Sequence, residues 1–233
     1  MRYTTIRKAT FLARPNRFIA QVLLEGEKTT VHVKNTGRCR ELLVPGASVY
    51  LAQAYNPARK TQYDLVAVEK GRRLINMDAQ APNQIFREWA ESGKFRPGLT
   101  LLRPETTWGN SRFDFYWEEI GHQSGEAPAH GFVEVKGCTL EEENWTLFPD
   151  APTQRGVKHM EELTRARAEG YEAAVCFVIQ MEGVSGFSPN DRTHPAFGAV
   201  LRKAVQAGVK VLAYECAVSP GEIVMTKAVP VLL

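Results

Sequence analysis

The sequence lacks several features that would restrict its class. Its four cysteines are widely spaced with no Cys-x-x-Cys pair, and its five histidines show no zinc-ligand spacing. These absences argue against a disulfide scaffold and a structural zinc site. No uninterrupted apolar run is long enough to cross a bilayer. Residues 1–5 also lack the apolar core of a signal peptide, so we expect a cytoplasmic protein without a membrane partner.

Charge is distributed unevenly along the 233 residues. Residues 1–80 hold 14 Lys and Arg against 6 Asp and Glu, whereas residues 81–233 hold 15 against 20. This asymmetry predicts two domains, 1–80 and 81–233, of which the first faces a polyanion such as nucleic acid. The alternative for the basic part is a solvated surface with no partner.

Short strand-like runs separated by tight turns fill the first 80 residues. The runs are 5–13, 18–24, 29–33, 49–54, 63–69 and 74–76. Few helical periods interrupt them, which is typical of a small β-barrel or sandwich. Five or six strands in this length favour an OB-type barrel, a fold that often binds oligonucleotides.

The pattern changes after residue 80. Asn83 is predicted to cap a helix that ends at Gly93, and Thr153 to open a second helix that ends at Gly170. The nearly continuous apolar run 171–180 predicts a central strand, and a helix over 195–207 precedes a strand over 209–218. Alternating strands and helices predict an α/β domain with a mixed sheet.

Two strand-like arms in this second domain carry a set of polar residues. In the first arm, 111–117, alternation places Phe113 and Phe115 on one face and Asp114 on the other. In the second arm, 131–136, Glu134 and Lys136 share a face. If the arms pair, two carboxylates and one ammonium come together.

Such a set is suited to holding Mg²⁺ for phosphodiester cleavage. The alternative is a solvated strand face with a weak surface ion pair.

Basic and polar groups also cluster in two loops of the first domain and at the start of the Thr153 helix. A helix start and basic loops both favour phosphate. The alternative for the loops is simple turns, and for the helix a solvated face. The candidate nucleic-acid contacts are Lys34, Asn35, Thr36, Arg38, Arg59, Lys60, Arg155 and Lys158.

With these residues laid out, the sequence resembles the sugar fermentation stimulation protein A family along essentially its whole length. The resemblance implies an OB-like first domain and a second domain like the PD-(D/E)xK, or restriction-endonuclease-like, nucleases. The matching blocks include 17–20, 35–37, 56–60, 111–115, 134–136, 148–151, 155–159 and 230–233.

The same resemblance implies roles for individual residues. Asp114 and Glu134 match the metal ligands, the main-chain carbonyl of Val135 completes the site, and Lys136 matches the catalytic Lys. The expected cofactor is Mg²⁺ or Mn²⁺. Two further members of the predicted catalytic set match acidic positions of the family, Glu88 and Glu105.

The sequence thus predicts a DNA-binding protein with a divalent-metal nuclease site. The alternative is a non-enzymatic regulator of sugar-utilisation genes that keeps the nuclease fold as a scaffold. A third hypothesis is a carbohydrate enzyme, but the sequence contains no set of residues typical of a sugar-binding site. The sequence leaves open DNA versus RNA, and a monomer versus a homodimer.

Overall fold

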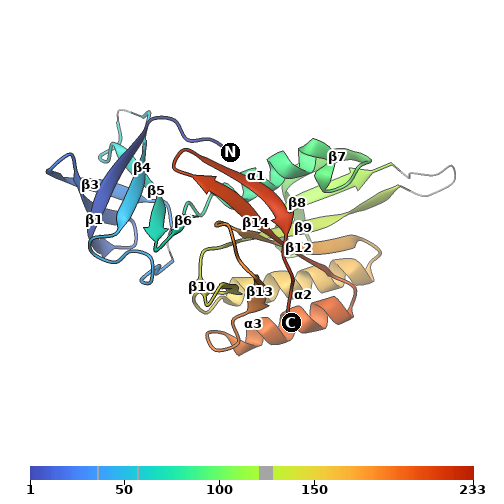
Figure 1. Ribbon diagram of the computed structural model, residues 1–233. Helices are drawn as coiled ribbons and strands as arrows, with labels where there is room; N and C mark the ends of the chain where they lie inside the picture. The colour runs from blue at the N-terminus through green and yellow to red at the C-terminus, as the bar shows by residue number, and fades with distance from the viewer. Residues whose placement is uncertain (36, 57, 121–127) are drawn as a thin grey trace.

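The structure is a computed structural model that describes residues 1–35, 37–56, 58–120 and 128–233. A six-stranded sheet from the N-terminal part lies beside a second six-stranded sheet from the rest of the chain (Figure 1). In the described part of the chain, no helix combines the length and the apolar character needed to span a bilayer.

The N-terminal sheet closes into a barrel. β1 (Ile6–Asn16) pairs antiparallel with β2 (Ile19–Leu24) and with β4 (Ser48–Gln53). β3 (Glu27–Val33) follows β2, β5 (Tyr63–Lys70) follows β4, and a short parallel pairing of β3 with β5 closes the ring. This closed five-stranded order confirms the predicted OB-type barrel.

Buried polar groups join the barrel to the second sheet where β6 (Arg73–Asn76) ends. Gln180 Nε2 donates to Asn76 Oδ1 at 2.8 Å and to the carbonyl of Asp78 at 3.0 Å. The fully buried Asp78 carboxylate lies 2.7 Å from Lys34 Nζ. Since buried polar groups need partners, these bonds favour one placement of the two halves.

The second sheet has the order β15-β14-β12-β9-β8-β7. Three central strands run parallel and the others are antiparallel to their neighbours. This confirms the predicted α/β domain with a mixed sheet. The strands are β7 (Leu99–Trp108), β8 (Ser111–Glu119), β9 (Ala129–Cys138), β12 (Glu172–Ile179), β14 (Lys210–Ser219) and β15 (Glu222–Ala228).

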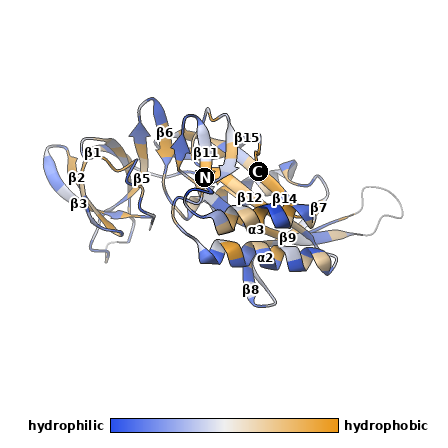
Figure 2. Ribbon diagram, turned by 90° about the horizontal axis from the view of Figure 1, so that it is seen from below, coloured by the Kyte–Doolittle hydropathy of each residue, from blue (hydrophilic) through white to orange (hydrophobic). Residues whose placement is uncertain are grey.

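Helices cover both faces of this sheet. α2 (Gln154–Ala168) and α3 (Pro195–Gln206) connect the parallel strands and pack on one face. α1 (Ala81–Trp89), continued by the π-helical turn η1 (Ala90–Lys94), packs on the other. β12 is therefore buried on both sides, and Figure 2 shows hydrophobic colour along β12 and β14.

The first residues of the chain lie against β15. Tyr3 N–H donates to the carbonyl of Gly221 at 2.8 Å, and Ile223 N–H donates to the carbonyl of Met1 at 3.0 Å. Arg2 Nε donates to Glu222 Oε1 at 2.7 Å. The first three residues are thus held against the start of β15.

The predicted start of the first helix is wrong. The helix begins at Ala81, with Gln80 at its N-cap, and among the described side chains none caps it. Pro82 lies in the first turn, where the missing N–H costs little. Asn83 instead donates from Nδ2 to Asp114 Oδ1 at 2.8 Å.

The Thr153 helix is confirmed, because Thr153 Oγ1 accepts the N–H of Gly156 at 3.0 Å.

The sequence patterns missed β13 (Gly186–Pro189), whose four residues pair with β11 (Trp145–Phe148) in a small sheet with β10 (Glu141–Glu142). The four residues of β13 are too few to show a period.

Packing around β12 yields a stability prediction. Phe177 is fully buried and stacks on Phe187 with ring centroids 4.0 Å apart. We expect Phe177→Ala to lower the free energy of unfolding by about 3–5 kcal/mol, because it leaves a cavity. Leu232→Ala, at a 62% exposed side chain, is the control and should change it by less than about 0.5 kcal/mol. Urea denaturation measures both, and equal effects would contradict the packing described.

Candidate active site and nucleic-acid interface

The two arms pair as predicted and then separate at Asp114. β8 and β9 are paired from Glu119 opposite Ala129 to Phe115 opposite Val133. Beyond this point Asp114 Oδ2 accepts the N–H of Val135 at 2.8 Å. A side-chain carboxylate therefore takes the backbone donor that a continued strand ladder would have used.

The expected alternation along the first arm is wrong at this point. Phe113 packs on Phe132, with centroids 5.0 Å apart, on the α2 face of the sheet. Phe115 packs on Phe86 of α1, at 5.2 Å, on the opposite face. The strand is distorted between the two rings, so Asp114 reaches toward β9 and α1.

Glu134 lies on the α2 face and is only 1% exposed. Its Oε1 accepts hydrogen bonds from Lys136 Nζ and from His159 Nδ1. Arg155 Nε in turn donates to His159 Nε2 at 3.4 Å. Within the described part of the chain, Glu134 Oε2 is buried and has no hydrogen-bond partner.

The pKa values of the two carboxylates are shifted in opposite directions. Burial and the nearby charge of Glu134 raise the pKa of Asp114, although the N–H of Val135 opposes this. Burial also raises the pKa of Glu134, but the hydrogen bond from His159 and the charge of Lys136 outweigh it and leave that pKa lowered. The charge of Lys136 lowers both pKa values.

These oxygens fit a hard divalent cation. Two carboxylates, one with a buried oxygen lacking a hydrogen bond, are the ligand type that Mg²⁺ and Mn²⁺ prefer. In residues 1–35, 37–56, 58–120 and 128–233, no three His, Cys, Asp or Glu side chains group as a metal site. A complete set of ligands here needs main-chain carbonyl or water oxygens as well.

The two other predicted acidic residues have different partners. Glu88 Oε2 lies 2.5 Å from the amino group of Met1, and Glu88 Oε1 accepts from Gln84 Nε2 at 2.9 Å. Glu105 lies on β7, with Arg112 at 3.6 Å and its side chain 70% exposed. The structure thus ties Glu88 to the N-terminus and Glu105 to the surface of β7.

Sequence patterns did not indicate that Asn83 bonds Asp114 or that His159 bonds Glu134. Asn83 had been assigned to a cap because Asn is common there. The bond of His159 to Glu134 joins residues from two separate elements, α2 and β9. Helix periodicity indicates a buried position at His159, because this residue lies three positions from the buried Gly156 and next to the buried Met160.

The predicted phosphate contacts divide into paired and exposed groups. Lys34 pairs with Asp78, and Arg59 Nη2 lies 2.6 Å from Asp64 Oδ1. Arg59 and the ring of His32 share this Asp64 carboxylate.

The remaining basic contacts are on the surface. Arg38, Lys60 and Arg155 are exposed, and Lys158 Nζ donates to the carbonyl of Asn110 at 2.8 Å. Asn35 Oδ1 accepts the N–H of Gly37. The predicted contact Thr36 lies outside the described residues.

Arg14 organises the loop that carries several of these residues. Its guanidinium donates to four main-chain carbonyls, those of Arg17, Asn35, Gly37 and Arg38. One side chain thereby ties the β1–β2 turn to the loop after β3. Charge counting did not single out Arg14, because its role depends on the folded loop.

A hollow of about 550 Å³ lies on the barrel beside the β1–β2 and β4–β5 loops. Phe18, 46% exposed, offers a ring face there. A ring face beside basic side chains is the combination with which OB folds hold bases and phosphates. The lining residues are Phe18, His32, Val33, Lys34, Arg59, Lys60, Thr61, Asp64 and Gln80.

A closed OB barrel followed by a mixed α/β domain defines a two-domain class of protein, and known families match both parts. The profile of the SfsA N-terminal OB domain matches residues 12–77. That of the sugar fermentation stimulation protein RE domain matches residues 80–222. The chain belongs to the sugar fermentation stimulation protein, or SfsA, family, which confirms the resemblance. Its OB domain suggests nucleic-acid binding.

Relatives cover the chain nearly end to end. A sugar fermentation stimulation protein homolog of Desulfitobacterium hafniense is 56% identical over 96% of this chain and 94% of its own. One of Ruminiclostridium cellulolyticum is 48% identical over 100% of both. The solved structure of Pyrococcus furiosus SfsA in complex with Ca²⁺ has a TM-score of 0.87 and 27% identity, covering 100% of this chain and 98% of that chain.

The opposite pKa shifts predict opposite pH dependences of stability. Because the pKa of Asp114 is raised in the folded protein, this residue contributes most to the free energy of unfolding below pH 3.8, its ordinary pKa. The contribution is lost as pH rises through the pKa of the folded state. In EDTA, the unfolding free energy of the parent minus that of Asp114→Asn should therefore fall as pH rises from about 4.

Glu134→Gln is the matched control. Because the pKa of Glu134 is lowered, its contribution to the free energy of unfolding is constant above pH 4.5, its ordinary pKa. The contribution is lost as pH falls below that value. Above that pH its difference from the parent should stay constant. Urea titrations from pH 4 to 8 test both, and a flat difference for Asp114→Asn would contradict the shift.

Proposed function

We propose that this protein binds DNA and cleaves phosphodiester bonds with a divalent metal ion. The observation that supports this proposal is the separation of β8 from β9, where Asp114 bonds the N–H of Val135 and the neighbouring Glu134 and Lys136 bond each other. Carboxylates and a Lys on rigid strands suit phosphodiester chemistry because they are positioned in advance. The proposed cofactor is Mg²⁺ or Mn²⁺.

Asp114, Glu134 and the main-chain carbonyl of Val135 are the proposed ligands. A metal ion held there would neutralise negative charge that develops on the phosphate. The Ca²⁺ complex of the Pyrococcus furiosus relative supports this, because Ca²⁺ also takes oxygen ligands.

Lys136 is the proposed catalytic residue. Its Nζ is held by Glu134 Oε1, so it is oriented before substrate arrives. From there it donates a hydrogen bond to the attacking water and favours the deprotonated form of that water. Arg155, exposed at the start of α2, contributes positive charge for a phosphate, together with the helix N-terminus.

The first test uses Lys136→Met, which removes the charge but keeps a chain of similar length. We expect unchanged folding and DNA affinity but loss of Mg²⁺- or Mn²⁺-dependent cleavage of plasmid and oligonucleotides, because the charge acts in the transition state. Lys203→Met, at an exposed residue of α3, is the control and should cleave like the parent. Equal cleavage by both variants would refute the role of Lys136.

Calorimetry with Mn²⁺ tests the metal site independently of cleavage. A binding isotherm should be present in the parent and absent in Asp114→Asn and Glu134→Gln. If both variants still bind Mn²⁺ like the parent, the metal lies elsewhere.

A scaffold that binds DNA without cleaving it, as a regulator of sugar-utilisation genes, is the second candidate. It is favoured by the placement of Glu88 at the N-terminus and of Glu105 at the surface, which leaves fewer acids at the site. If the parent cleaves neither DNA nor RNA, single- or double-stranded, with either metal, this candidate replaces the nuclease.

The barrel is the proposed main source of nucleic-acid affinity, and Lys60 tests it. Lys60→Ala should weaken binding of DNA irrespective of sequence and reduce the slope of log affinity against log salt by about 0.7–0.9. Arg59→Ala should also lower stability, because it leaves Asp64 with one partner fewer. Lys28→Ala, exposed at the far end of β3, is the control. Equal slopes for Lys60→Ala and Lys28→Ala would contradict the interface.

A further inference from the structure

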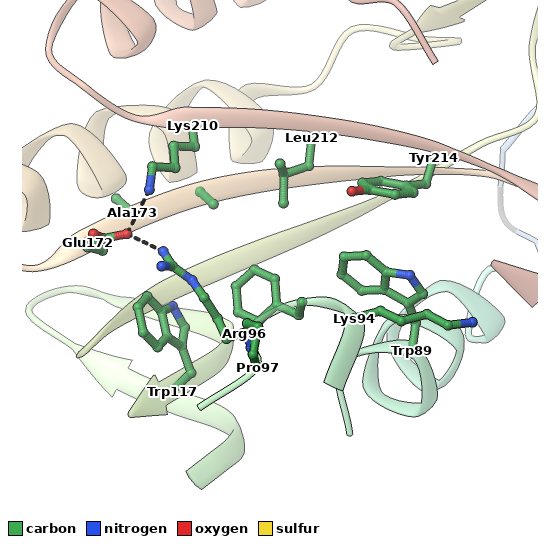
Figure 3. Close-up of a pocket in the computed structure, with 12 residues that line it drawn as sticks. Trp89, Lys94, Arg96, Pro97, Trp117, Glu172, Ala173, Lys210, Leu212 and Tyr214 are labelled. Atoms are coloured by element: carbon green, nitrogen blue, oxygen red, sulfur yellow. Dashed lines mark hydrogen bonds and ion pairs between the residues drawn. The ribbon is translucent and has the colours of Figure 1, made fainter. Parts of the chain in front are cut away.

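A hollow of about 300 Å³ lies on the α1 face of the second sheet, where β12 and β14 begin (Figure 3). It is separate from the proposed active site, because Glu172 pairs with Gly131 three positions before Glu134, and Glu134 projects from the other face. The lining residues are Trp89, Lys94, Phe95, Arg96, Pro97, Trp117, Glu172, Ala173, Ala174, Lys210, Leu212 and Tyr214.

The hollow exists because a small side chain meets an irregular helix end. Ala174 on β12, opposite Lys210 on β14, leaves space above the sheet. The π-helical turn η1 contains Gly93 at φ 80°, a left-handed conformation that glycine adopts without strain. This turn brings Phe95 back over the sheet beside the space that Ala174 leaves.

Aromatic rings form two sides of the hollow. Trp89 and Tyr214 lie with centroids 4.7 Å apart, and Phe95 and Trp117 lie perpendicular at 5.7 Å. Phe95 also contacts Trp89, with ring centroids 6.0 Å apart, so the rings are continuous. Figure 3 shows Leu212 and Tyr214 across from Trp117 and Trp89. Trp117 is buried, whereas Phe95 and Tyr214 are half-exposed, so they present ring surface to a ligand. Such walls favour a flat ring system.

The charged groups lie at opposite ends. Glu172 Oε2 accepts from Arg96 and, at 3.0 Å, from Lys210 Nζ, and both contacts are drawn in Figure 3. The Arg96 guanidinium also lies 4.4 Å from the ring centroid of Trp117, which fixes it in place. Lys94 extends past Trp89 at the other end, and among the described residues it has no ion-pair partner.

We propose that this hollow binds a nucleotide whose base carries an exocyclic amine. The base lies against the aromatic rings, and its amine donates to Glu172 Oε1, because Arg96 and Lys210 both bond to Oε2 of that carboxylate. The phosphate lies at Lys94. The three lining cations Lys94, Arg96 and Lys210 outnumber the two carboxylates that pair with Arg96, Glu172 and Glu119, which favours an anion. The ligand is either a free mononucleotide or the terminal nucleotide of a single strand.

Tryptophan fluorescence titration of the full chain with AMP, CMP and UMP tests the chemistry. AMP and CMP should give saturable changes, and UMP should bind about tenfold more weakly, because its base offers a carbonyl to Glu172. Lys94→Ala should weaken AMP about three- to tenfold and leave adenosine unchanged. Lys203→Ala, an exposed Lys on α3, is the control and should bind AMP like the parent.

No saturable response to AMP and CMP, equal affinity for UMP, or equal effects of Lys94→Ala and Lys203→Ala would overturn the proposal. A second variant, Ala174→Leu, fills the hollow and should abolish AMP binding; a folded variant that still binds AMP also overturns it. Asp114→Asn should bind AMP normally, so this result is independent of the proposed nuclease activity.

A 5′-phosphorylated tetra-adenylate distinguishes the two sources of the nucleotide. If it binds as tightly as AMP and competes with it, the site accepts a strand end. If AMP binds and the tetranucleotide does not, the ligand is a free nucleotide. Either result supports a nucleotide site.

Discussion

The buried segment from Asn76 to Asp78, which Gln180 of the second sheet binds, is the constraint on which the relative placement of the two halves depends. An ionised carboxylate in a protein interior is strongly destabilising unless it is paired. Lys34 provides that pairing for Asp78, while Gln180 from the second sheet binds the main chain of the same residue. The charge of Lys34 is thus neutralised inside the protein, which leaves the exposed Arg38 and Lys60 as candidate phosphate contacts.

The same constraint bears on the proposed active site. Gln180 follows β12 directly, and a Cβ on Gly137 would lie 2.5 Å from Gln180 Oε1. Gly137 in turn follows Lys136. The bonds that join the barrel to the sheet therefore lie against the segment that carries the proposed catalytic Lys.

Much of the fold could be predicted because it follows from local patterns. Alternating residues in 1–80 predicted the barrel strands, and Thr153 predicted a helix start that the structure confirms. The distortion at Asp114 could not be predicted in this way. It depends on a bond from the N–H of Val135, and only the folded pair of strands brings that donor within reach.

The environment of the site shows the same limit. Asn83 and Asp114 are 31 residues apart in sequence, and Glu134 and His159 are 25 apart. Composition predicted a basic first domain, yet it could not show that Asp78 and Asp64 neutralise two of the candidate contacts. Which charges face solvent depends on tertiary pairing, and residue counts do not contain that information.

The contact between residues 1–3 and the start of β15 has a consequence for the order of events during synthesis. Arg2 and Glu222 are separated by 220 positions, and the amino group of Met1 and the carbonyl of Ile223 by 222. At about 5–20 residues per second, the ribosome needs on the order of tens of seconds to make the intervening chain. The barrel strands can pair during that interval, but the residues that precede them must wait for β15. Residues 1–3 are made before the barrel strands, yet they reach their native partners only after β15 has been made.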